Sequence, residues 1–302
     1  MHTTPGSKAL KTTQPSWINA GIVTDPPSRI GRTQSGEVPL VSSLDDAYSW
    51  CLKFAKSHYE NFPVVSVLLT KQAQRALAAV YAIARIGDDI ADEPFTGNRL
   101  EALATLDAVV DNRIEPGGHP AYMAIQDTIS KFRLPTDPFH RLFMAFRFDA
   151  ENTASGTAQP PTIRFNTWEE VHQYCNSSAN PVGELYLRIH GQWSDAVKPM
   201  SDALCTALQI TNFLQDLSVD VPRGRLYIPG LPNNPLQDLV QTQRALDDAK
   251  NHTARLYTAA RTLYQVVHPL RLRLTLRTIA LGGRIILARC NISSLTKRVK
   301  HP

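Results

Sequence analysis

Apolar residues recur at helical spacing along most of the chain from Leu44 onward. A repeat of three to four residues places such side chains on one face of an α-helix, and the strict alternation expected of strands is almost absent. The pattern predicts helices over residues 44–60, 71–93, 99–112, 121–132, 138–150, 168–192, 200–220, 236–266 and 269–289. Thr167 and Glu170 have the spacing of a capping box at the start of one helix. We therefore expect an all-α, single-domain protein.

The first 43 residues differ from the rest because they are rich in Pro, Ser, Thr and Gly and show no sustained period. Such a composition is typical of a disordered leader. The segment has no apolar stretch of the kind found in secretory signals, and an organelle transit peptide stays an open alternative. The expected organisation is a leader over 1–43, a helical domain over 44–290 and a basic tail over 291–302.

Positive charge is concentrated at the C-terminal end. The formal net charge is +5, yet residues 1–270 hold 24 Lys and Arg against 27 Asp and Glu, a net of −3. Residues 271–302 hold eight basic residues and no acidic one. The apolar run 274–288 is interrupted by Arg277 and Arg284, so it is too short and too charged to span a bilayer.

Two interpretations of this basic segment are equally consistent with the sequence. It is either an amphipathic helix that lies on an anionic membrane surface or a last core helix with a solvated basic face. Binding to nucleic acid is less favoured, because the segment has no aromatic residue on which a base could stack. The oligomeric state is left open by the sequence.

One line of polar side chains runs along the predicted helix 71–93: Tyr81, Arg85, Asp88 and Asp92. Steps of four, three and four residues place them on one face, while most other positions are Ala, Leu, Ile or Val. Two carboxylates one turn apart repel each other, so their presence in an apolar helix favours a cation between them. The alternative is a solvent-facing polar edge with an Arg85–Asp89 ion pair.

The predicted helix 200–220 repeats this design with a second line of polar side chains: Gln209, Asn212, Asp216 and Asp220. Their amide and carboxylate oxygens are ligands that Mg²⁺ prefers. A single stripe of this kind is weak evidence. Two stripes on two helices predict a divalent-metal site between them.

Arg223-Gly224-Arg225-Leu226-Tyr227 follows directly, and its guanidinium groups suit a diphosphate because they form bidentate hydrogen bonds to phosphate oxygens. Taken alone, such a run is usually a surface loop. Upstream, His58 and Phe62 lie one helical turn apart, and His58 is as consistent with a structural role as with a catalytic one.

The sequence has no dinucleotide fingerprint, P-loop, nucleophile elbow or zinc-protease motif, so no nucleotide cofactor is visible. The four cysteines lack the spacing of zinc ligands. They favour a reducing, cytoplasmic compartment over a disulfide framework.

These motifs resemble those of the squalene/phytoene synthase family, whose members share an all-α isoprenoid-synthase bundle with a central cavity. The resemblance covers about residues 44–290 and rests on three elements: Tyr81-x-x-x-Arg85-x-x-Asp88-Asp89-x-x-Asp92, Gln209-x-x-Asn212-x-x-x-Asp216-x-x-x-Asp220 and Arg225-Leu226-Tyr227. Within the family the chain is most similar to the hydroxysqualene synthase branch of bacterial hopanoid biosynthesis. Three segments support this: His58–Pro63, Ser177–Gly183 and Thr211–Asp216.

The resemblance implies roles for named residues. The expected catalytic set is Asp88, Asp92, Asp216, Asp220, Arg85 and Tyr81. The expected Mg²⁺ ligands are Asp88, Asp92, Asn212, Asp216 and Asp220. The expected substrate-binding set is His58, Phe62, Tyr174, Gly183, Gln209, Asn212, Arg225 and Tyr227, with aromatic side chains walling the pocket for a carbocation.

The implied reaction converts presqualene diphosphate and water to hydroxysqualene and diphosphate. One alternative is head-to-head condensation of two farnesyl or geranylgeranyl diphosphates, which gives presqualene diphosphate, dehydrosqualene or phytoene. Another is a non-catalytic assembly factor of the same fold. Two positions depart from the family pattern, since Gln215 and Glu184 stand where arginine is expected.

Overall fold

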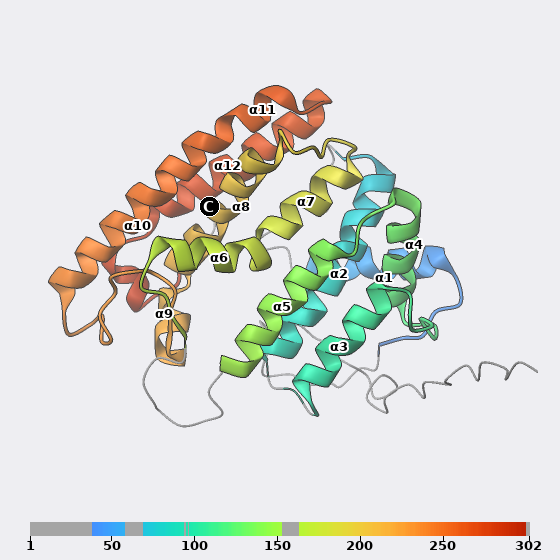
Figure 1. Cartoon of the computed structure of the whole chain (residues 1–302), viewed down its shortest axis with the longest axis horizontal. Helices are drawn as coiled ribbons and strands as arrows, with labels where there is room; N and C mark the ends of the chain where they lie inside the picture. Colours follow the sequence, from blue (N-terminus) through green and yellow to red (C-terminus); the bar gives the residue numbers. More distant parts are fainter. Residues whose placement is uncertain (1–37, 58–68, 94, 96, 153–162, 300–302) are drawn as a thin grey trace, which may run out of the picture.

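The computed structural model describes residues 38–57, 69–93, 95, 97–152 and 163–299 (Figure 1). Its longer helices are α1 (Leu44–Ser57), α2 (Lys71–Asp92), α3 (Arg99–Val110), α4 (Pro120–Phe132), α5 (Asp137–Asn152), α6 (Trp168–Ser178), α7 (Asn180–Ile189), α8 (Lys198–Gln215), α10 (Leu239–Ala259) and α12 (Leu270–Arg289). Its short elements are β1 (Ile163–Arg164), α9 (Leu217–Asp220), η3 (Val221–Arg223), β2 (Arg225–Leu226), η4 (Ala260–Thr262), α11 (Leu263–Val266) and η5 (Ile292–Leu295). The predicted all-α fold is confirmed.

Three predicted helices are divided in the structure. The segment 168–192 breaks at Ala179, because Pro181 in the first turn of α7 suits a new helix start and has no N–H with which to continue an old one. The segment 200–220 breaks at Asp216, where φ is −100° and ψ is 12°. The segment 236–266 breaks at Ala260.

The start of α6 confirms the predicted capping box. The Thr167 hydroxyl accepts a hydrogen bond from the Glu170 N–H at 3.2 Å, and the Glu170 carboxylate accepts one from the Thr167 N–H at 3.2 Å. Two N–H groups that the helix itself cannot satisfy are paired in this way.

The helices form two groups that α6 and α7 connect (Figure 1). In the first group α2 packs against α1, α3, α4 and α5. In the second, α8 packs against α10 and α12. Both α6 and α7 contact α5 on one side and α8 on the other. The first acidic stripe therefore belongs to the first group, and the second stripe to the second group.

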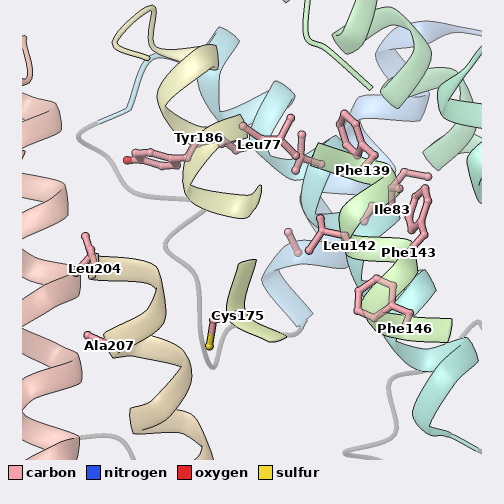
Figure 2. Close-up of a cluster of buried hydrophobic side chains, with 14 of the residues drawn as sticks. Leu77, Ile83, Phe139, Leu142, Phe143, Phe146, Cys175, Tyr186, Leu204 and Ala207 are labelled. Carbon is pink, nitrogen blue, oxygen red and sulfur yellow. The ribbon is translucent and has the colours of Figure 1, made fainter. Parts of the chain in front are cut away.

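Helix α5 fixes the position of α2 through a row of buried side chains that Figure 2 shows along their contact: Phe139, Leu142, Phe143 and Phe146. Burying each such side chain stabilises the fold by about 1.5–3 kcal/mol. A Cβ added at Gly87 would lie 2.6 Å from the Phe146 ring, so glycine allows the two helices to approach closely. This contact brings Asp88 of α2 close to the C-terminal half of α5.

The strands β1 and β2 form a two-residue parallel ladder in which Ile163 pairs with Arg225. The Ile163 N–H donates to the Gly224 carbonyl at 3.3 Å, and the Phe165 N–H donates to the Leu226 carbonyl at 3.1 Å. This ladder holds the backbone on both sides of Arg225 in place.

Helix α12 contains the apolar run 274–288, which Arg277 and Arg284 interrupt. Among the described residues, no helix combines the length and the hydrophobicity that a membrane span requires.

Candidate active site

Arg225 links the first acidic motif to the segment that follows the second. Its guanidinium donates to both carboxylate oxygens of Asp92, with Nη1–Oδ2 at 2.9 Å and Nη2–Oδ1 at 2.7 Å. Arg225 is only 5% exposed, so both hydrogen bonds form away from bulk water, where charge-assisted pairs are strong. The end of α2 is thereby tied to the segment that follows α9, 133 residues later in the sequence.

Carboxylates of the two motifs influence each other's ionisation. Desolvation raises the pKa of Asp220 to about 7, and the negative charges of Asp216 and Asp92 add to this rise while Arg225 opposes it. Desolvation of its buried part also raises the pKa of Asp88, opposed by Arg85 and Arg225 and increased by Asp92. Because 45% of the Asp88 side chain still meets solvent, a solute can reach it. Asp92 of the first motif and Asp220 of the second therefore lie near enough for their charges to interact.

Asp149 of α5 belongs to the same cluster, and the sequence analysis missed it. It is 8% exposed and accepts a hydrogen bond from the Tyr174 hydroxyl at 2.7 Å. Desolvation raises its pKa to about 7, the Tyr174 hydrogen bond and Arg225 oppose this rise, and Asp92 and Asp88 increase it. Asp149 follows Leu142 and Phe146 at i+7 and i+3, so an acidic residue on the apolar face of α5 was the signal that could have identified it.

Aromatic side chains from four segments line one side of this cluster: Phe165, Tyr174, Phe213 and Tyr227. Tyr227 stacks on Phe213 with ring centroids 4.3 Å apart, and Tyr174 lies 5.8 Å from Tyr227. Desolvation and the charge of Asp149 raise the pKa of both phenols well above their ordinary value, so both remain neutral. The structure thus places Tyr174 and Tyr227 beside the carboxylates.

Arg85 forms ion pairs within α2. Its Nη2 lies 2.6 Å from Asp89 Oδ1 and its Nη1 lies 3.2 Å from Asp88 Oδ2. The Arg85–Asp89 pair that the alternative interpretation predicted is confirmed, but it is not a solvent-facing edge, because Asp89 is buried and the Arg85 side chain is 27% exposed. Desolvation raises the pKa of Asp89 to about 7, against the effect of Arg85. Tyr81, one turn earlier, packs half-buried against the hydrophobic core.

The second stripe keeps its helical spacing through the break at Asp216. The Asp216 N–H donates to the Asn212 carbonyl and the Asp220 N–H donates to the Asp216 carbonyl, both at 2.9 Å. The side chains of Gln209 and Asn212 are half-buried, and their ligand roles stay predictions. His58 and Phe62 lie outside the described residues.

Gly183 has a packing role in the structure. A Cβ at this position would lie 2.5 Å from the Cys205 sulfur and 2.6 Å from the Ser201 hydroxyl, so glycine permits α7 to approach α8. Gly183 also borders an apolar cavity of about 40 Å³ between α7, α8 and α12. Its predicted contact with substrate stays a prediction.

Within the described ranges, no three His, Cys, Asp or Glu side chains already converge as a metal site. Three of the expected ligands are instead paired with arginine: Asp88 with Arg85, Asp92 with Arg225 and Asp216 with Arg298. The geometry is that of a carboxylate cluster from both helix groups, bordered by arginine and by neutral aromatic rings.

A family model described as squalene/phytoene synthase matches residues 55–294. The chain belongs to the squalene/phytoene synthase family. This family acts on prenyl diphosphates.

Curated relatives of the chain include hydroxysqualene synthases and phytoene synthases. The hydroxysqualene synthase of Rhodopseudomonas palustris is 35% identical over 182 residues, which cover 59% of this chain and 58% of the relative. That of Zymomonas mobilis is 34% identical over 56% of this chain and 54% of its own length. The chloroplastic phytoene synthase 1 of Zea mays is 30% identical over 66% of this chain and 48% of its own length. The chain thus matches only about half the length of these relatives.

Two solved structures extend the comparison. The squalene synthase HpnC of Alicyclobacillus acidocaldarius is 32% identical, with a TM-score of 0.70 over 82% of this chain and 93% of that one. A dehydrosqualene synthase in complex with a ligand is 22% identical, with a TM-score of 0.67 over 80% of this chain and 84% of that one. The second likeness is one of fold.

The structure accounts for both departures from the expected squalene/phytoene synthase pattern. Glu184 is buried and forms ion pairs with Arg141 of α5 at 2.6 Å and Arg188 of α7 at 2.8 Å, so it joins two helices. The buried Gln215 amide donates to the Val299 carbonyl at 2.7 Å, which holds the C-terminal segment beside the second motif.

Proposed function

We propose that the protein is a Mg²⁺-dependent prenyl-diphosphate enzyme that converts presqualene diphosphate and water to hydroxysqualene and diphosphate. The main support is the carboxylate cluster from α2, α5 and α9 around buried Arg225, with aromatic rings beside it. The choice of reaction within the family draws on the hydroxysqualene synthases that are 34–35% identical to this chain.

The cluster fits Mg²⁺ by its chemistry. The carboxyls of Asp88, Asp149 and Asp220 have pKa values raised by desolvation and by neighbouring carboxylates, so a nearby cation would stabilise their ionised forms. Hard carboxylate oxygens are the ligands that Mg²⁺ prefers. The residues that would hold it are Asp88, Asp92, Asp216 and Asp220, assisted by Asn212. When bound, Mg²⁺ supplies positive charge that stabilises the departing diphosphate.

The arginines of the chain bind and orient the diphosphate. Arg225 presents a fixed guanidinium, because the β1–β2 ladder holds its backbone, and Arg85 presents a second one from α2. The bond between carbon and the diphosphate oxygen breaks with both electrons leaving on oxygen. The charge that develops there is stabilised by these donors.

The aromatic wall protects the carbocation that remains. Tyr174, Phe213 and Tyr227 offer ring faces that attract positive charge, and their phenols stay neutral and poorly nucleophilic. Exclusion of other nucleophiles lets rearrangement precede capture. A water oxygen then forms the new bond to carbon and releases one proton, which balances the reaction to hydroxysqualene.

Substitution of single carboxylates tests this role. Asp88→Asn and Asp216→Asn should each abolish turnover of presqualene diphosphate while the circular dichroism of the helices stays unchanged. Retained turnover in both variants would show that these carboxylates do not hold a required cation.

Head-to-head condensation is a second candidate, favoured by the 32% identical structure named a squalene synthase and by the phytoene synthases among the relatives. This reaction would use the same site and give a different product. Turnover of farnesyl diphosphate to a cyclopropyl diphosphate, with no hydroxysqualene formed from presqualene diphosphate, would select it.

We also propose that α12 contacts the inner, anionic face of the cytoplasmic membrane. Three leucines on its outer side are strongly exposed, Leu270 at 61%, Leu274 at 41% and Leu281 at 60%. Arg271, Arg277 and Arg284 are exposed among them, and α12 has no acidic residue. Apolar and basic side chains on one helix surface suit an anionic lipid interface, and a C30 product is insoluble in water.

A further inference from the structure

The C-terminal segment Asn291–Val299 lies against the second acidic motif. It begins with η5, which Asn291 caps through hydrogen bonds with Ser293 and Ser294. Ser294 and Leu295 are buried, so the start of the segment is firmly anchored. It contacts α9, the helix that ends in Asp220.

Arg298 occupies both carboxylate oxygens of Asp216. Its Nε lies 2.5 Å from Oδ1 and its Nη2 lies 3.2 Å from Oδ2. The adjacent Val299 carbonyl accepts the Gln215 amide at 2.7 Å. Two neighbouring residues of the segment therefore bind two neighbouring residues of the motif, 82 to 84 residues earlier in the sequence.

We infer that Arg298 and a divalent cation compete for Asp216, so that the segment Asn291–Val299 is a latch that the cation displaces. This inference rests on the metal site of the proposed function. The guanidinium takes one lone-pair direction of each Asp216 oxygen, so a metal ion that approached from the same side would have to displace it. A cation bound there would also repel the guanidinium.

The end of the latch is more exposed than its start. The Arg298 side chain is 42% exposed, whereas the Leu295 anchor three residues earlier is buried. The ion pair can therefore open without unpacking the anchor. A chain of three residues spans at most about 10 Å, so the freed guanidinium stays near the same carboxylates and any diphosphate bound there.

Coupling between two binding events is reciprocal, so the competition has two observable sides. Loss of Arg298 should tighten cation binding, and cation binding should loosen the latch. Manganese(II) takes the same oxygen ligands as Mg²⁺, and its free concentration is measurable by electron paramagnetic resonance. The competition can thus be followed without any substrate.

The experiment titrates Mn²⁺ into the full-length protein, the Arg298→Ala variant and the Lys297→Ala variant. Lys297 is the matched control, because it is the exposed neighbouring cation. Removing a partly exposed ion pair should tighten Mn²⁺ binding about threefold in Arg298→Ala and leave Lys297→Ala unchanged. Arg298→Lys should fall between Arg298→Ala and the natural protein, since lysine keeps the charge and loses the bidentate geometry.

The second readout is amide hydrogen exchange of residues 296–299 in the natural protein, which saturating Mg²⁺ should accelerate. Equal or weaker Mn²⁺ binding by Arg298→Ala, or unchanged exchange, would overturn the competition alone. Absence of Mn²⁺ binding in every form of the protein would overturn both the competition and the metal site of the proposed function.

Discussion

At the scale of single residues, Arg225 holds the end of the first acidic motif against the segment that follows the second. Its planar guanidinium reaches both oxygens of Asp92 at once, which a lysine ammonium cannot do. Arg225→Lys should lower kcat/KM about 100-fold, because a fixed donor to the developing charge is lost. Steady-state kinetics with a prenyl diphosphate measure this effect.

Arg164→Lys is the matched control for that measurement. Arg164 lies on the paired strand β1 and donates to neutral acceptors, the Leu231 carbonyl and the Asn233 side chain. It should keep kcat/KM within a few-fold of the natural protein. Equal losses in the two variants would mean that Arg225 acts only through the stability of the ladder.

Asp149 should make the free energy of unfolding depend on pH when no metal is bound. Its pKa is raised to about 7 in the folded state, against an ordinary value near 4. Between about pH 4 and pH 7 the carboxyl group is therefore protonated in the folded protein and ionised in the unfolded chain. Its contribution to stability is fully present below about pH 4 and is lost as the pH rises through about 7.

With Asp149→Asn, the free energy of unfolding should therefore decrease less between about pH 4 and pH 7 than it does in the natural protein. It should raise the stability at pH 8 by up to about 4 kcal/mol, while Asn still accepts the Tyr174 hydrogen bond. Urea unfolding in EDTA at pH 5 and pH 8 measures this, with exposed Asp195→Asn as the control. A pH slope equal to that of the natural protein would contradict the buried, protonated Asp149.

Contacts between residues close in the sequence could be predicted from their spacing. Contacts between residues far apart in the sequence could not. The Arg85–Asp89 pair and the Thr167 capping box follow from spacing on one helix. The Arg298–Asp216 pair joins residues 82 positions apart and depends on how the helices pack. No local pattern contains that information.

At the scale of helices, the approach of α2 to α5 sets the distance between Asp88 and Asp149. Gly87→Ala would place a Cβ 2.6 Å from the Phe146 ring, which is 8% exposed and has little room to move. Such overpacking should lower the free energy of unfolding by about 1–3 kcal/mol and weaken Mn²⁺ binding. Thermal unfolding and metal titration measure the two effects.

Gly282→Ala on α12 is the matched control, because nothing lies within 4 Å of its added Cβ. It should raise stability by about 0.5–1 kcal/mol through helix propensity. A stabilised Gly87→Ala variant would show that the α2–α5 contact is looser than described.

The extent of helix was predictable from apolar periodicity, and its interruptions were not. Residues on both sides of Ala179 and of Asp216 continue the same periodic pattern, so the pattern predicts one helix where the structure has two. The two-residue β1–β2 ladder is too short for any period, yet it positions Arg225.

At the scale of the whole molecule, the outer face of α12 is expected to bring the protein to an anionic membrane. Replacing Leu270, Leu274 and Leu281 by serine should reduce binding to anionic vesicles about tenfold or more, because three apolar anchors are lost. Co-sedimentation with vesicles containing phosphatidylglycerol measures this.

Leu239→Ser with Val240→Ser is the matched control, since both residues are at least half exposed on α10. Binding should be unchanged in that variant and should fall with added salt in the natural protein. Equal partitioning of the α12 variant and the natural protein would exclude this face as the membrane contact.

Product analysis shows directly what becomes of the carbocation. The purified protein is incubated with presqualene diphosphate and Mg²⁺, without NADPH, in water enriched in ¹⁸O, and the products are identified by mass spectrometry. We expect hydroxysqualene that contains one ¹⁸O atom, and no product when EDTA replaces Mg²⁺. Unchanged presqualene diphosphate, or a hydrocarbon product without oxygen, would contradict the proposed reaction.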